Sequence, residues 1–402
     1  MLVRFQFSNY RCFRDDQELS LLAAPPKNRL RLLRTANPEL HLLRVAAIYG
    51  ANASGKSTVL EALRFLRSAV VDSHQTWLPN QGVPLSPHRP SDGRPSHFEV
   101  TFFSDGTLFE YGFTADGERV LRERLIASKG RRHVWFERDA RRTEPFSFGK
   151  SLRGENRAIS RLARPNSLFL STAAANNHPM LGPVYSWFEK LLFAGPEDRS
   201  DRLVSTMEAI QRSSTRAGVL DFLRQADLGI TGFHVPSPAE LDAYRPGGDP
   251  LQPRLELRHR SGSKEFLLPF GEESLGTRAL FALAAPLLAC LDEGSILSFD
   301  ELDSSLHPYL VREVVRTFQD PLRNPKGAQL LFNTHDVTLL GDLPDDSPLD
   351  RDEVWVTERL PEGGSRLVPL SDYKPRNDEN LERGYLLGRY RGVPLLDFAA
   401  RG

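Results

Sequence analysis

Hydrophobic and polar residues alternate in several short segments near the start of the chain, a pattern typical of β-strands with one buried face. These segments are residues 2–7, 98–103, 108–113, 120–128 and 134–138. Asp105-Gly106 and Asp116-Gly117 separate three of them, and Asp-Gly is a strong signal for a tight hairpin turn. The pattern therefore predicts an antiparallel sheet, with residues 18–23 able to pair with the first strand.

Apolar residues at helical spacing replace this alternation from about residue 149 to 232, most clearly at 184–193 and 218–223. Polar breaks interrupt the pattern, so it predicts a helical insertion of modest size rather than a coiled-coil arm. The Pro- and Gly-rich residues 236–253 indicate a flexible connection. A strand at 254–258 is then expected to resume the sheet.

Three mainly apolar runs are expected to be buried parallel strands. They are residues 45–49, 295–299 and 330–332. Helical patterns follow the first two, at 58–66 and 306–318. Strands that alternate with helices predict an α/β sheet whose functional residues gather at the carboxyl ends of the strands.

The first of these strands leads into Gly50-Ala-Asn-Ala-Ser-Gly-Lys-Ser57, a G-x4-G-K-S phosphate loop in its required strand-loop-helix setting. Backbone N–H groups of such a loop point at phosphate oxygens, and the helix adds its positive end. Lys56 would neutralise the β and γ phosphates, and the Ser57 hydroxyl would hold Mg²⁺. The residues expected to bind ATP here are Gly50, Asn52, Ala53, Ser54, Gly55, Lys56, Ser57 and Thr58.

Asp300 and Glu301 follow the second strand. Two carboxylates after a strand are common at loop starts, but beside a phosphate loop they have the Walker B arrangement. In that interpretation Asp300 holds Mg²⁺ through water, and Glu301 orients and polarises the attacking water. His335 follows the third strand, and although histidines at strand ends are often surface or capping residues, this one is expected to reach the γ phosphate.

The segment Glu272-Glu-Ser-Leu-Gly-Thr-Arg278 precedes an apolar helix at 279–291. Ser274 can be an ordinary N-cap with Gly276 for the turn. A helix N-terminus with serine and glycine is also an anion site, which could complete its hydrogen bonds with the γ phosphate of a second subunit. The residues alone leave these two interpretations open.

Composition limits the partners and the cellular compartment that we expect for the protein. The 402 residues include 52 Lys+Arg and 52 Asp+Glu, so the whole chain has no net attraction for nucleic acid or acidic membranes, although a local basic groove is left open. The 2 cysteines imply no disulfide framework. The apolar run at 279–291 contains Pro286 and is short for a membrane span. A cytoplasmic protein without membrane association is expected.

The order of these motifs resembles the ABC-type ATPase heads of the SMC, Rad50 and RecF group. Within that group the chain is most similar to bacterial AAA15/AAA_21-type ATPases, relatives of the ATPase half of overcoming-lysogenisation-defect nucleases. The resemblance rests on five segments: Phe7–Phe13, the phosphate loop, Ser274–Thr277, Asp300–Pro308 and Gly384–Pro394.

The resemblance implies a fold and a set of site residues. The fold would be an α/β ABC-type head with a mixed sheet, an antiparallel β-subdomain and a helical insertion. It would have an N-terminal lobe (1–149), the insertion (150–250) and a C-terminal lobe (251–402). ATP would hold two subunits head to tail, as a homodimer or higher oligomer. The further residues implied are Asn9 and Arg11 near the nucleotide, the signature residues Ser274, Gly276 and Thr277 acting in trans, and Ser304 and Ser305 of the D-loop.

The chain departs from the family pattern at a few points. Ala51 and Ala53 stand where many of these ATPases have Pro and Gly, and His307 replaces the usual D-loop aspartate. No clear Q-loop glutamine is present, and Gln75 and Gln81 are weak candidates. The chain stops soon after the last sheet strands, so a nuclease activity of its own is not expected.

The leading hypothesis is an ATP-hydrolysing switch in bacterial antiphage defence with a separately encoded effector or nuclease subunit, as the resemblance implies. The alternative is a RecF/SMC-like ATPase that binds DNA in repair or chromosome maintenance. Arg131-Arg132 and Arg138–Arg142 could contact phosphates, but they equally suit solvated hairpin edges. The nucleotide-binding half of a transporter fits less well, because the insertion before Ser274 is long and the signature is not transporter-like.

Overall fold

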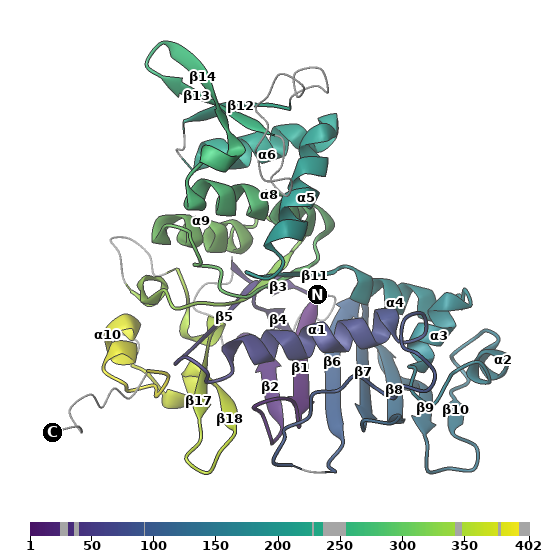
Figure 1. Ribbon diagram of the computed structural model, residues 1–402. Coiled ribbons are helices and arrows are strands. Elements are labelled where there is room, and N and C mark those ends of the chain that lie inside the picture. Colours follow the sequence, from purple (N-terminus) through teal and green to yellow (C-terminus); the bar gives the residue numbers. More distant parts are fainter. Residues whose placement is uncertain are drawn as a thin grey trace.

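The structure is a computed structural model of the whole chain, shown in Figure 1. It describes residues 1–24, 31–35, 40–91, 93–226, 229–235, 255–341, 348–376 and 379–393. Two large sheets lie on either side of a long helix, α1, and a smaller unit projects above them. The predicted α/β class, with a mixed sheet, an antiparallel sheet and inserted helices, is confirmed.

The antiparallel sheet contains the alternating segments. Its strand order is β10-β9-β8-β7-β6-β1-β2. The strands are β1 (Leu2–Ser8), β2 (Gln17–Ser20), β6 (Ser96–Ser104), β7 (Thr107–Ala115), β8 (Val120–Lys129), β9 (Arg131–Asp139) and β10 (Phe146–Phe148). Asp105 and Gly106 turn between β6 and β7 with φ of 46° and 70°, as a tight hairpin requires. The predicted hairpins, and the pairing of β2 with β1, are confirmed.

The central sheet contains the apolar runs. Its order is β11-β15-β16-β5-β17-β18, parallel except for the last pair. The strands are β11 (Leu191–Ala194), β15 (Ile296–Phe299), β16 (Gln329–Asn333), β5 (Val45–Gly50), β17 (Val354–Arg359) and β18 (Ser365–Pro369). Consecutive residues of β5 pack into different cores, Ala46 and Ile48 on the α1 face and Val45 and Ala47 on the other. Burial on both faces explains the continuous apolar sequence.

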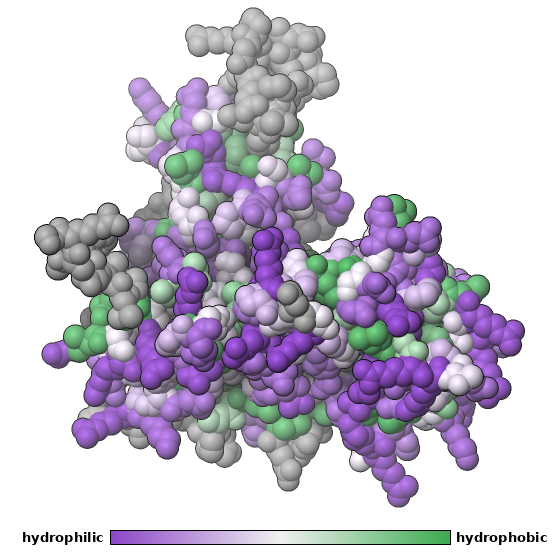
Figure 2. All heavy atoms as spheres, turned by 60° about the horizontal axis from the view of Figure 1, so that its bottom comes forward, coloured by the Kyte–Doolittle hydropathy of each residue, from purple (hydrophilic) through white to green (hydrophobic). Residues whose placement is uncertain are grey.

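Helices cover both faces of the central sheet. On one side α1 (Lys56–Asp72) packs between the two sheets, with α4 (Leu181–Glu189) beside it next to β11, while α2 (Asn156–Ser160) and α3 (Phe169–Ala175) lie over the antiparallel sheet (Figure 1). On the other side lie α8 (Leu275–Glu293) and α9 (Pro308–Gln319). On the face shown in Figure 2 the surface is mostly hydrophilic, with apolar residues in small separate patches.

Residues 191–193 are not helical, contrary to the prediction. They belong to β11, which pairs in parallel with β15 as an edge strand of the central sheet. The expected helical insertion at 150–250 therefore contains a strand of this sheet. The pattern misled because α4 ends only two residues earlier, and a short apolar run after a helix looks like its continuation.

A unit that we call the arm projects from the central sheet (Figure 1). It consists of α5 (Arg199–Gln211), α6 (Ser213–Gln225), β12 (Ile230–His234), β13 (Glu256–Ser261) and β14 (Lys264–Pro269). The strand expected at 254–258 does not resume the antiparallel sheet, because β13 pairs with β12 and β14 in a separate sheet. The predicted flexible connection, 236–253, lies outside the described residues.

Helix α8 joins the arm to the central sheet. It is the one described helix that is long and apolar enough to cross a membrane by length and composition. Its residues, however, belong to two packed cores: Leu280 and Phe281 face the arm, whereas Leu283 and Leu287 face α9 and the sheet. The apolar sequence of α8 is thus explained by its place between two parts of the fold.

Short elements complete the chain. They are β3 (Leu33–Arg34), β4 (His41–Leu42), the 3-10 turns η2 (Phe270–Glu272), η3 (Val337–Leu340), η4 (Arg351–Glu353) and η5 (Leu370–Tyr373), and helix α10 (Leu381–Leu386). The predicted closing segment 384–394 packs beside β5, where the Tyr385 ring lies 5.5 Å from that of Tyr49. Its last residue, Pro394, is outside the described residues.

Candidate nucleotide site

The candidate phosphate loop follows β5 and is held in place by glycine packing and by the Ser54 hydroxyl. Gly50 has φ 154°, and a Cβ atom there would lie 2.2 Å from Thr357 Oγ1, so only glycine fits beside β17. The Ser54 hydroxyl lies 2.8 Å from the Ala51 carbonyl oxygen and 2.6 Å from Thr357 Oγ1. Ala53 has φ 59°, in the left-handed region that favours glycine, which gives a physical reason for glycine at this position in related ATPases.

Lys56 lies inside the loop. It is 7% exposed, and its ammonium donates to the carbonyl oxygens of Gly50 at 2.9 Å and Ala51 at 3.2 Å. Burial lowers the pKa of Lys56, while the carboxylates of Glu301 and Asp300 act in the opposite direction. A phosphate group placed here would meet a cation that has already lost most of its water.

Asn333, at the end of β16, connects the loop to the candidate Walker B residues. It is fully buried. Its Nδ2 donates to Ser57 Oγ at 3.3 Å and also to Asp300 Oδ1, and its Oδ1 accepts from the Glu301 N–H at 2.5 Å. Three predicted site residues from two elements thus meet at one amide. The sequence analysis did not single out Asn333.

Ser57 and Asp300 fit a magnesium site. Their side-chain oxygens are held toward the same nitrogen of Asn333. Mg²⁺ in nucleotide sites uses one or two protein oxygens and completes its shell with phosphates and water. A hydroxyl and a carboxylate beside a phosphate loop provide that donor set, so these two residues would hold the ion that accompanies ATP.

Glu301 and His335 leave neighbouring strands at the same edge of the sheet, as predicted from the strand order. Both residues are exposed. Glu301 has φ 54°, and its N–H is fixed by Asn333. The backbone N–H of His335 lies 3.3 Å from both carboxylate oxygens of Asp303, a further residue that the sequence analysis missed.

The turn after β1 packs against the phosphate loop. A Cβ atom at Gly55 would lie 2.9 Å from both Cys12 Sγ and the Phe13 ring. Arg11, with φ 48°, forms an ion pair with Glu61 of α1. The turn expected near the nucleotide therefore contacts the loop that would bind it.

Asn9 lies in the same turn, but its side chain has another role. It is 2% exposed, its Nδ2 donates to the Arg94 carbonyl oxygen at 2.7 Å, and its Oδ1 accepts from the His88 N–H at 3.2 Å. Both amide atoms are used within the protein. The Asn9 side chain thus braces the loop at residues 86–94 rather than facing the phosphate loop.

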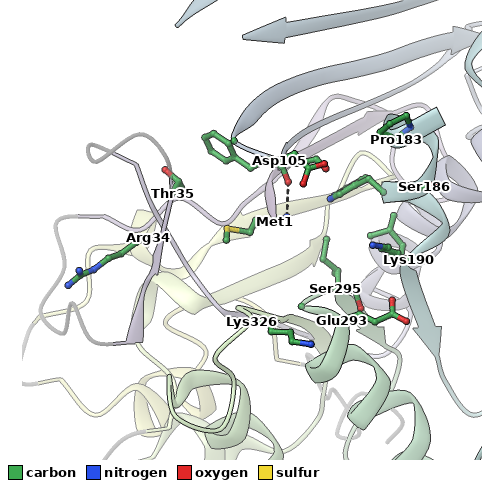
Figure 3. Close-up of a pocket in the computed structure, with 17 residues that line it drawn as sticks. Met1, Arg34, Thr35, Asp105, Pro183, Ser186, Lys190, Glu293, Ser295 and Lys326 are labelled. Carbon is green, nitrogen blue, oxygen red and sulfur yellow. Dashed lines mark hydrogen bonds between the residues drawn. The ribbon is translucent and has the colours of Figure 1, made fainter. Parts of the chain in front are cut away.

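Cavities open on both sides of this turn. One of 280 Å³ is lined by Ser57, Asp300 and Arg11, and one of 920 Å³ is lined by Arg11, Ala53 and Arg359 among others. Both adjoin the phosphate loop. A third cavity of 560 Å³, shown in Figure 3, lies at the amino ends of β11 and β15 beside Ser295, at the opposite edge of the central sheet.

Neither weak candidate for the Q-loop glutamine, Gln75 or Gln81, lines the cavities beside the phosphate loop. Glu197 and Asp198, which follow β11, line the smaller one together with Ser57. Asp198 accepts two hydrogen bonds, at 3.0 and 2.6 Å, from Arg64 of α1. An acidic pair after an apolar run is the same signal as Asp300-Glu301, but the helical interpretation of 184–193 concealed it.

The candidate signature begins α8. Ser274 is the N-cap, and its hydroxyl accepts from the Thr277 N–H at 3.1 Å. A Cβ atom at Gly276 would lie 3.2 Å from the Ser305 carbonyl oxygen, so the signature and the D-loop are neighbours within one subunit. The ordinary capping role of Ser274 is therefore present, and the anion-binding interpretation stays compatible with it.

His307 caps α9 where related ATPases have an aspartate. Its Nδ1 accepts from the Tyr309 N–H at 3.3 Å, and the two rings stack at 5.5 Å. Just before it, the Ser304 N–H donates to the Glu301 carbonyl oxygen at 2.9 Å. The D-loop is thus a tight turn anchored on the candidate catalytic residue.

Solved structures with a similar chain path are SMC heads. One is the SMC head bound to the C-winged helix domain of ScpA, with 12% identity, a TM-score of 0.46, and coverage of 91% of this chain and 97% of that one. The SMC head domain from Thermotoga maritima has 15% identity and a TM-score of 0.42, covering 92% and 98%. A Pyrococcus yayanosii SMC head with coiled coil and joint has 11% identity and a TM-score of 0.40, covering 93% and 99%. At such values the likeness assigns no function.

Among curated proteins, no relative matches the sequence. A protein-family match, in contrast, runs from residue 45 to 341. It starts with the strand before the phosphate loop and includes the signature helix, the Asp300-Glu301 strand and His335. Because this match covers most of the chain, the protein belongs to the ATPase family described as "AAA domain, putative AbiEii toxin, Type IV TA system".

Proposed function

We propose that the protein hydrolyses ATP to ADP and phosphate and uses this reaction as a switch. The observation that carries the proposal is the Asn333 amide, which joins Ser57 of the phosphate loop to Asp300 and Glu301. The hydroxyl of Ser57, the carboxylate of Asp300 and the backbone of Glu301 are thereby held at one point. That is the arrangement phosphoryl transfer to water needs.

In this site each residue has one task. The phosphate-loop N–H groups and Lys56 hold the β and γ phosphates, and Mg²⁺ on Ser57 and Asp300 supplies neutralising charge. Glu301 orients a water molecule and takes its proton as the water oxygen bonds to the γ-phosphorus. The bond from that phosphorus to the bridging oxygen breaks, ADP keeps the electron pair, and His335 contacts the γ phosphate.

The signature surface supports a head-to-tail homodimer around ATP. Leu275 and Tyr309 are 58% and 66% exposed. Leu275 adjoins Gly276 in the sequence, and Tyr309 follows the D-loop, whose Ser305 is close to Gly276. Large apolar side chains around a helix N-terminus fit a surface that a second subunit covers. Ser274, Gly276 and Thr277 would then bind the γ phosphate of the partner's ATP.

Replacing Glu301 with glutamine tests both the catalytic role of Glu301 and the ATP-bound dimer. The variant should bind ATP, lose at least about 100-fold in turnover, the scale of a lost catalytic group, and accumulate as a dimer with ATP. Molar mass by light scattering and phosphate release measure these effects. Glu144→Gln, at an exposed turn, is the matched control. Unchanged turnover would refute the role of Glu301, and an ATP-bound monomer would refute the dimer.

For the biological role, we propose part of an antiphage system, and the family description supports this proposal. That description names a toxin of a toxin–antitoxin system, which supports the hypothesis of an antiphage system with a separately encoded effector. Expression of the chain with its neighbouring genes should then reduce plaque formation, and Lys56→Ala should abolish the protection. Equal plaque counts with and without the intact genes would remove this role and leave the ATPase proposal standing.

Two of the arginines that motivated the DNA-binding alternative, Arg132 and Arg138, are bound within the protein. Arg138 is 6% exposed and donates to the Ser167 carbonyl oxygen at 2.6 Å. Arg132 is bound to Glu110 by two hydrogen bonds, at 3.1 and 3.0 Å. These guanidinium groups serve the fold of the antiparallel sheet.

A further inference from the structure

A hydrogen-bonded histidine and glutamate lie directly before the candidate signature. Glu273, which precedes Ser274, is 6% exposed, and its Oε1 is 2.6 Å from Nε2 of His259 on β13. The half-exposed ring of Phe266 on β14 stacks on the imidazole at 5.6 Å and 20°. The arm thus supplies a hydrogen-bond donor to the residue at the start of α8.

The position of this carboxylate matters because of what else α8 is expected to bind. Ser274 satisfies the Thr277 N–H. Within the described residues, no acceptor takes the N–H groups of Leu275 and Gly276. A carboxylate is the natural anion for such groups, and it is also favoured there by the helix dipole. An unrestrained Glu273 would therefore compete with a phosphate and repel it.

We propose that His259 is a positioning residue for the signature. Its imidazole holds the Glu273 carboxylate away from the N-terminus of α8, so the N–H groups of Leu275 and Gly276 can donate hydrogen bonds to the γ phosphate of the partner's ATP. This inference rests on the proposed ATP-bound dimer. It adds a contact from β13 of the arm to the residue directly before the signature.

The pair is not needed to attach β13 to the body of the arm. The Phe270 N–H donates to the Leu255 carbonyl oxygen at 2.8 Å, and Leu257 packs with Phe270 and Phe281 in the arm core. These contacts hold the strand beside α8 without help from His259. The charge of Glu273, in contrast, has the His259 imidazole as its bonded side-chain partner.

The test measures ATP-driven dimerisation, in the Glu301→Gln background so that turnover does not interfere. His259→Ala should weaken dimerisation about tenfold, equivalent to one charge-assisted hydrogen bond, while ATP binding by the monomer stays the same. His259→Gln keeps an N–H donor and should lie between the two. His259→Ala with Glu273→Gln removes the stray charge as well and should restore dimerisation to within about threefold of the parent.

Several outcomes would overturn the inference. Dimerisation of His259→Ala at the parental level is one, and failure of the double variant to recover is another, because a merely structural role would not be rescued by removing charge. If His259→Ala does not fold, Glu273→Gln alone decides: it should dimerise at least as tightly as the parent, and weaker dimerisation contradicts the proposal.

Ser274→Ala separates this inference from the function on which it rests. Should Ser274→Ala leave dimerisation unchanged, the signature does not hold the partner's ATP and the proposed interface is wrong. Should it weaken dimerisation while His259→Ala does not, only the role of His259 fails.

Discussion

Replacing Asn333 with alanine should stop ATP turnover while ATP binding persists. Asn333 holds Ser57, Asp300 and the Glu301 backbone in one place, so its loss releases both the magnesium ligands and the residue that orients water. The phosphate loop keeps Lys56 and its backbone N–H groups. Binding of ATP should therefore change by no more than about threefold, a difference well below 1 kcal/mol.

The size of the effect follows from the three hydrogen bonds. Two join neutral groups, each worth about 0.5–1.5 kcal/mol, and the one to the Asp300 carboxylate is worth about 1.5–3 kcal/mol. Together they amount to about 2.5–6 kcal/mol. If only the lower figure is lost from the transition state, turnover falls on the order of 100-fold.

The buried Asn324 provides a matched control. It is also fully buried, donates to the carbonyl oxygens of Phe318 and Ala328 at 2.8 Å each, and accepts from the Ala328 N–H at 2.7 Å. It lies before the amino end of β16, whereas Asn333 lies at the carboxyl end. Asn324→Ala should lower the thermal midpoint by a similar amount and keep normal turnover.

The assay is steady-state phosphate release at saturating ATP and Mg²⁺, with thermal unfolding of each variant measured in parallel. A folded Asn333→Ala protein with wild-type turnover would refute the reasoning. So would an equal loss of turnover in both variants, since the effect would then come from stability rather than from the site.

Three further predictions concern binding and stability. Lys56→Ala should weaken ATP binding at least about tenfold, by removing a charge-assisted contact, as isothermal titration would show. Gly384→Ala should cost about 1–3 kcal/mol, because its Cβ atom would lie 2.6 Å from Tyr390 Oη, whereas Gly182→Ala, with open space around it, should be neutral or stabilising in urea unfolding. Burial raises the pKa of Glu353 from 4.5 to about 8, so its contribution to stability is complete below pH 4.5 and is lost as pH rises through 8. Compared with Glu353→Gln, the wild-type free energy of unfolding should fall on the order of 2–4 kcal/mol more between pH 5 and 8, and parallel pH curves would contradict this.

The parts of the fold that local sequence determines could be predicted. Strands β6 to β9 alternate in hydropathy and turn at residues that favour tight hairpins. Strand β11 could not be recognised in this way, because its four residues follow α4 almost directly and its partner β15 lies about 100 positions later. Strand β13 was recognised as a strand, but its partners were not, since pairing depends on the arm as a whole.

In the candidate site, too, local motifs could be predicted and long-range contacts could not. Lys56, Ser57, Asp300 and Glu301 lie in motifs with fixed spacing, so their proximity followed from strand order. Asn333 acquires its role only when β16 lies beside β15, and no spacing rule marks it. Asn9 was expected near the nucleotide, and its turn does contact the phosphate loop, but the hydrogen bonds of its buried amide with Arg94 and His88 could not be predicted from the sequence.

The place of the arm in the chain has a consequence for how such proteins can vary. Strands β11 and β15 are parallel neighbours, and parallel neighbours require a crossover connection, which here is α8. The arm is inserted into that connection, before α8. Residues can thus be gained or lost in the arm without altering the sheet. Any rotation of the arm, in contrast, would move the first turn of α8, where the candidate signature lies.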